Sequence, residues 1–94
     1  MDLVIVGAGG FGRECLDWIR QAGATPGHTY AGSTVVGFID DGVVDEDLLQ
    51  RMGSELLGTT AWLADRLDVR FLVAIGSPSV RRAVVQGLGR VSIT

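Results

Sequence analysis

The fold is decided by the stretch LVIVGAGGFGRECLDWI, which runs from residue 3 to residue 19. Its apolar start predicts a buried strand, its glycine-rich centre a tight turn, and its remainder an amphipathic helix. The glycines fit the pattern G-x-G-x-x-G, in which the first allows the turn, the second lets a phosphate approach the backbone, and the third lets helix and strand pack closely. We therefore expect a nucleotide or nucleotide-sugar site. The alternative is a glycine turn that only closes a helix against a sheet.

Free amides at the start of the predicted helix would face the ligand and favour an anion there. Arg13 either leans toward a diphosphate or simply lies on the first turn of the helix, and the sequence leaves both open. The candidate binding residues of this segment are Gly7, Gly9, Gly10, Phe11, Gly12 and Arg13.

Composition narrows the class of protein. The chain has 94 residues, which is enough for one domain, and its net charge of −3 with no basic cluster beyond Arg81 and Arg82 argues against nucleic-acid or anionic-membrane binding. Cys15 is the only cysteine, so an internal disulfide and a thiolate zinc site are excluded. The N-terminus has no basic region followed by an apolar core, and no stretch has the length of a membrane span, so we expect a cytoplasmic protein.

Strands and helices are predicted to alternate along the rest of the chain. β-branched and apolar runs predict strands at residues 34–39, 55–58, 70–75 and 91–94. A short helical turn is expected within residues 42–52, and Thr59 or Thr60 is expected to cap a helix that runs through Leu67, with Leu63 and Leu67 on its inner face. Ser77 is expected to cap a last helix, whose Val80, Ala83, Val84 and Leu88 form one stripe.

This alternation predicts the α/β class, namely a single small Rossmann-like domain over residues 1–94 with an open parallel sheet and helices on both faces. The first and fourth strands should flank the switch point, and ligands bind outside the carboxyl ends of such strands. The glycine turn should therefore meet the acidic pair Asp40 and Asp41, as well as Gly76 and Ser77. An acid at the end of the second strand binds a ribose hydroxyl in dinucleotide folds, and the alternative for this pair is a solvated turn.

Four motifs occur in a familiar order: residues 4–14, 36–41, 57–59, and 73–78 followed by Arg81 and Arg82. Together they resemble the N-terminal domain of bacterial sugar acetyltransferases, a family that includes sialic acid O-acetyltransferases, perosamine N-acetyltransferases and the enzymes that acetylate amino sugars of pilin and other protein glycans. The resemblance covers nearly the whole chain. It implies that this domain holds a UDP-linked sugar, with Asp40 and Asp41 on the nucleoside, for glycan or polysaccharide biosynthesis.

In that family a C-terminal left-handed β-helix binds acetyl-CoA, carries the general-base histidine and forms the trimer. The sequence ends at Thr94, before any hexapeptide repeat. This domain is therefore expected to bind no cofactor and no metal, and to have no catalytic residue. Alone, it is expected to have no transferase activity and to be monomeric or weakly self-associating. The runner-up interpretation is a free-standing NAD- or nucleotide-binding regulatory module.

The remaining conspicuous side chains are expected to have structural or surface roles rather than catalytic or metal-binding ones. His28 is expected to be an ordinary surface residue, because no carboxylate in its loop would orient it. Cys15 is expected to be a small buried thiol, and Trp18 and Trp62 to be packing or interface residues. Residues 45–47 are acidic and are expected to be a solvated loop rather than a metal site.

Overall fold

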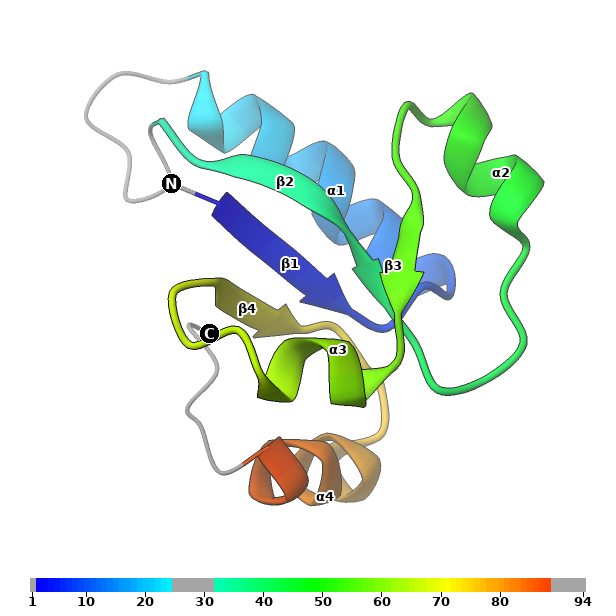
Figure 1. Cartoon of the computed structure of the whole chain (residues 1–94). Helices are drawn as coiled ribbons and strands as arrows, with labels where there is room; N and C mark the ends of the chain where they lie inside the picture. The colour runs from blue at the N-terminus through cyan, green and yellow to red at the C-terminus, as the bar shows by residue number, and fades with distance from the viewer. Residues whose placement is uncertain (1, 25–31, 89–94) are drawn as a thin grey trace.

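The protein folds around a four-stranded parallel sheet, shown by a computed structural model that describes residues 2–24 and 32–88 (Figure 1). The strands are β1 (Asp2–Val6), β2 (Thr34–Ile39), β3 (Leu56–Gly58) and β4 (Arg70–Val73), and their order in the sheet is β3-β2-β1-β4. β1 pairs with β2 on one side and with β4 on the other, so the strand order reverses beside β1. The predicted α/β class and its switch point between the first and fourth strands are confirmed.

Helices cover both faces of the sheet, because alternate side chains of β1 enter two separate cores. On one face Leu3 and Ile5 pack with α1 (Gly10–Gly23) and α2 (Glu46–Arg51). On the other face Val4 and Val6 pack with α3 (Thr60–Ala64) and, less closely, with α4 (Pro78–Leu88). The carboxyl ends of the strands therefore open between two helical layers.

Local sequence explains where these helices begin. The amide of Leu48 donates to the Asp45 carboxylate at 3.1 Å, which caps α2, so the acidic residues 45–47 begin a helix rather than a loop. Ser77 precedes Pro78 at the start of α4, and its hydroxyl accepts from the amide of Val80 at 3.4 Å. α1 buries Leu16, Ile19 and Ala22 at helical spacing, as its sequence predicts.

A single arginine ties the two helices of one face together. The Arg20 guanidinium on α1 donates to the carbonyl oxygens of Met52 at 2.7 Å and Gly53 at 3.2 Å, directly beyond the end of α2. Carbonyls at the end of a helix have no partner within it, so this contact fixes α2 against α1.

The predicted extent of α3 is wrong. α3 ends at Ala64 instead of Leu67, because amides after Leu63 turn back by short bonds, such as Arg66 to the Leu63 carbonyl at 3.0 Å, and the chain leaves to enter β4. Leu63 is buried, whereas Leu67 is 78 % exposed. In the predicted stripe of α4, Val84 and Leu88 pack partly against the second core, whereas Val80 is 49 % exposed. The predictions for His28 and for a strand at 91–94 lie outside the described residues.

Candidate functional site

The glycine turn between β1 and α1 has the geometry that its spacing predicts. Gly7 has a φ of 111°, a conformation that glycine adopts without strain, and its amide donates to the Ile39 carbonyl at 2.7 Å. A Cβ on Gly12 would overlap the carbonyl oxygen of Gly7. The first and third glycines are therefore needed for the turn and for the close approach of α1 to β1.

The second glycine of the motif stands apart from this packing. A Cβ on Gly9 would have no atom within 4 Å, and its φ of −78° is open to any residue, so nothing in the fold itself requires glycine there. Within residues 2–24 and 32–88, no acceptor pairs with the amides of Gly10, Phe11 and Gly12, whereas the Arg13 amide bonds to the Gly9 carbonyl at 3.0 Å. Gly10 and Phe11 are exposed, so the start of α1 presents unpaired amide donors at the surface, whereas Gly12 is buried where α1 packs on β1.

Arg13 lies over this turn. Its guanidinium Nη1 donates to the Ala8 carbonyl at 3.3 Å, and its Nη2 lies 3.9 Å from where a Cβ on Gly10 would be. The side chain therefore supports the loop and adds positive charge beside the open amides.

Asp40, at the end of β2, holds the same turn from the other side. Its Oδ2 accepts from the Ala8 amide at 2.9 Å, and its Oδ1 accepts from the Gly42 amide at 2.8 Å. Both groups of Ala8 are thus bonded, the amide by Asp40 and the carbonyl by Arg13. The predicted meeting of the glycine turn with the acidic pair is present as a direct hydrogen bond.

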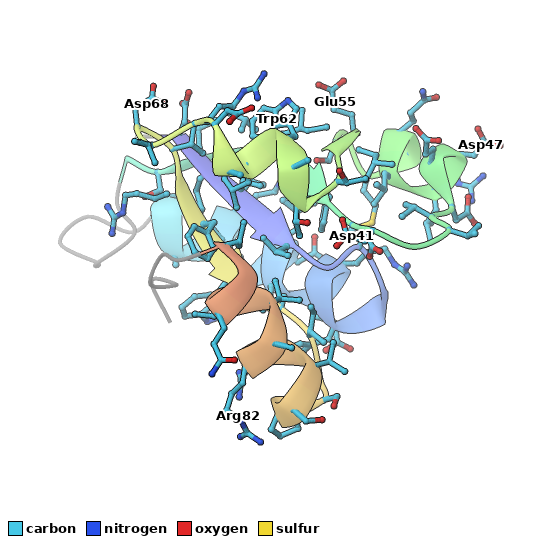
Figure 2. The ribbon with its side chains drawn as sticks, turned by 60° about the horizontal axis from the view of Figure 1, so that its bottom comes forward. Asp41, Asp47, Glu55, Trp62, Asp68 and Arg82 are labelled. Atoms are coloured by element: carbon cyan, nitrogen blue, oxygen red, sulfur yellow. The ribbon has the colours of Figure 1, made fainter. Side chains whose placement is uncertain are left out.

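Asp41 holds a different element, the start of α3 (Figure 2). Its Oδ1 accepts from the Thr60 amide at 2.8 Å and its Oδ2 from the Thr60 hydroxyl at 3.1 Å. Thr59 occupies the N-cap position but makes no side-chain cap bond, so Asp41 supplies the missing cap from 19 residues away. Sequence reasoning predicted Thr59 or Thr60 as the cap and did not identify this contact.

A small cavity of about 180 Å³ opens where these elements meet, at the carboxyl ends of β1 and β2. It continues into a wider groove of about 500 Å³ between α3 and α4, since Asp41, Thr60, Val80 and Val84 line both. The cavity is lined by Val6, Gly7, Asp40, Asp41, Thr60, Ile75, Val80 and Val84.

The structure brings only part of the predicted set to this cavity. Gly7, Asp40 and Asp41 line it, whereas the open amides beyond Gly9 belong to the adjoining turn. Gly76 and Ser77 are exposed and follow Ile75, which does line it. Thr60 was missed as a site residue; it lies near the carboxyl edge of the sheet, just beyond β3, but no sequence motif links it to the cavity.

The other conspicuous side chains of the described residues can be compared with their predicted roles. Burial, and then the carboxylate of Glu14, raise the pKa of the half-buried Cys15 thiol, so it is not an activated nucleophile. Among these residues no group of three or more His, Cys, Asp or Glu side chains could hold a metal ion. Trp18 is half exposed, and Trp62 packs partly on the second core with the Arg66 guanidinium 3.9 Å from its ring centre.

Asp41 lies apart from several other labelled side chains in Figure 2. In Figure 2 Asp41 lies near the centre of the view, whereas Glu55, Trp62 and Asp68 lie along the upper edge and Arg82 points away from α4. No helix within the described ranges is long and apolar enough to cross a membrane.

Comparisons with known proteins identify the family of this domain. Among curated proteins, none matches the chain. A family model described as the PglD N-terminal domain matches residues 2–88. The resemblance carried by the four sequence motifs is thereby confirmed, and the chain belongs to the family of N-terminal domains of PglD-type sugar acetyltransferases.

Proposed function

We propose that this domain binds a UDP-linked sugar for a bacterial acetyltransferase that uses acetyl-CoA in glycan or polysaccharide biosynthesis. The observation that carries the proposal is the turn at Gly9, where open space and unpaired amides coincide although the fold does not need a glycine there. A glycine that only closed a helix against a sheet would be as crowded as Gly12. An anion, by contrast, needs both the space and the amides.

The two halves of the ligand have chemically different places. The diphosphate would lie over the amides of Gly10, Phe11 and Gly12, with the Arg13 guanidinium adding charge at one side. The nucleoside would lie in the adjoining cavity, with its hydroxyls toward Asp40 and Asp41. The opposite wall of that cavity is apolar and suits the flat face of a base; it consists of Ile75, Val80 and Val84.

We assign binding rather than chemistry to this domain. Acetyl transfer needs a positioned base and a bound thioester, and the described cavity holds carboxylates that are already bonded to amides and no histidine or cysteine. The proposal therefore places the catalytic base, acetyl-CoA and the trimer contacts outside this domain. We expect the chain to act in the cytoplasm. On its own it should have no acetyltransferase activity and should self-associate weakly at most.

The test compares ligands on matched glycine variants. UDP at about 100 times its Kd should stabilise the protein by about 2.7 kcal/mol, which thermal melting detects. Gly9→Val should still fold but lose this response, because its side chain fills the phosphate position. Gly87→Val is the control, since Gly87 on α4 is equally free of neighbouring atoms and lines only the wider groove, not the cavity proposed for the nucleoside.

In the same experiment, the binding of each ligand distinguishes between the alternative functions. UDP and a UDP-amino sugar should bind to the wild type and to Gly87→Val, with no response to acetyl-CoA. Binding of NAD without UDP would instead support a free-standing dinucleotide module. A folded Gly9→Val variant with unchanged UDP affinity would overturn the placement of the diphosphate.

A further inference from the structure

The side chains that line the cavity offer hydrogen-bond acceptors only. The polar ones are Asp40, Asp41 and Thr60, and an ionised carboxylate can accept but not donate. Each carboxylate already accepts two bonds from the protein, one at each oxygen, and an oxygen has a second lone pair for a ligand. The backbone amide of Gly7, which also lines the cavity, is used by the Ile39 carbonyl.

Thr60 would ordinarily be the exception, because a hydroxyl can donate or accept. Here its proton is committed: the hydroxyl donates to Asp41 Oδ2 at 3.1 Å, while the Thr60 amide fixes Asp41 Oδ1 at 2.8 Å. The double contact holds the two side chains in one relative orientation. The Thr60 oxygen therefore presents only lone pairs to the cavity.

We propose that Thr60 is a specificity-determining residue of the nucleoside site, and that its hydroxyl, oriented by Asp41, accepts a hydrogen bond from a ribose hydroxyl of the ligand. This inference rests on the proposed function. Ribose is the favoured partner because its hydroxyls are donors and the acceptor wall lies at the end of β2, whereas the apolar wall opposite suits the base. A ligand without a donor at this position leaves the acceptors unpaired and binds more weakly.

The experiment measures the affinities of UDP, 2′-deoxy-UDP and 3′-deoxy-UDP for the full chain by calorimetry. In the wild type one deoxy analogue should bind about 3- to 10-fold more weakly than UDP, the range for one hydrogen bond. Thr60→Val keeps the shape and the amide but removes the oxygen, so UDP should bind as weakly as that analogue and the discrimination should vanish. Thr60→Ser keeps the hydroxyl and should restore the discrimination.

Asp41→Asn provides an independent variant, since it reverses the direction of the hydrogen bond between residue 41 and the Thr60 hydroxyl without removing the hydroxyl. The asparagine amide nitrogen would donate to the Thr60 oxygen, which turns the hydroxyl proton toward the cavity. A ribose hydroxyl would then accept from Thr60 instead of donating to it, so the affinity ratio between UDP and the deoxy analogue should differ from that of the wild type, with the fold checked by circular dichroism.

The outcomes separate this inference from the proposed function. If no nucleotide binds to the wild type, the proposed function fails. If UDP binds but Thr60→Val weakens UDP and both analogues equally, or if both Thr60→Val and Asp41→Asn keep the wild-type discrimination, Thr60 has only a structural role and this inference is overturned.

Discussion

Replacing Asp40 by asparagine should destabilise the free protein, whereas the same replacement at Asp41 should leave its stability nearly unchanged. Both oxygens of Asp40 accept from backbone amides, those of Ala8 at 2.9 Å and Gly42 at 2.8 Å. An asparagine has one acceptor oxygen, so its NH₂ group must face one of these donors. At Asp41 only one partner is an amide; the other is the Thr60 hydroxyl, which can turn and accept.

The size of the effect follows from the burial of the two amides. The asparagine oxygen would stay on the partly buried Ala8 amide, and the NH₂ group would face Gly42, whose exposed amide can bond to water instead. Asp40→Asn should therefore lower the free energy of unfolding by about 1.5 kcal/mol, which is below the full cost of a buried unpaired donor. For a domain of this size that corresponds to a fall of about 6–12 °C in melting temperature. Asp41→Asn should cost less than about 0.5 kcal/mol, since both contacts survive.

Thermal melting followed by circular dichroism at neutral pH, with urea unfolding as a second measure, checks this difference. The two variants are matched in charge, because each removes one carboxylate from a chain of net charge −3. Equal losses at the two positions would refute the reasoning, because the asymmetry comes only from the identity of the donors. A larger loss at Asp41 would show that the cap of α3 matters more than the tie to the glycine turn.

Further predictions concern the packing of α1. Gly12→Ala should lower the free energy of unfolding in urea by about 2 kcal/mol or more, because its Cβ overlaps a backbone carbonyl. Gly87→Ala should raise that free energy by about 0.5–1 kcal/mol through helix propensity, and equal effects of the two substitutions would contradict this reasoning. Arg20→Ala should cost about 1–2 kcal/mol by releasing the end of α2, and an unchanged unfolding midpoint would show that water replaces the contact. Cys15 should react with iodoacetamide more slowly than a cysteine in an unfolded peptide at the same pH, since its raised pKa leaves less thiolate; Glu14→Gln should speed the reaction, and a native rate equal to that in urea would argue against the pKa shift.

The sequence predicted those parts of the fold that depend on local pattern. The apolar run before Gly7, the glycine spacing and the stripe of α1 are all contiguous signals, so β1, the turn and α1 could be read directly. The acid at the end of β2 was predictable for the same reason, because strand and acid are neighbours along the chain.

The remaining features depend on contacts between distant residues. The sequence predicted that the glycine turn and Asp40 lie close together, but not that the Ala8 amide donates to the Asp40 carboxylate, a bond that spans 32 positions. Leu67 has the right spacing from Leu63 for a helix face, but the turn into β4 overrides that pattern and leaves it exposed. Thr60 shows its role only through Asp41 and the cavity, so no local motif could have identified it.

The cap that Asp41 supplies to α3 also constrains the order in which the molecule folds. A helix as short as Thr60–Ala64 does not persist alone in water, and its cap comes from the far end of β2. α3 should therefore form only after β2 and β3 have found their register, since that pairing brings Asp41 to Thr60. The wall of the cavity is then a late product of non-local assembly, and a nascent chain acquires its ligand pocket only when the sheet is nearly complete.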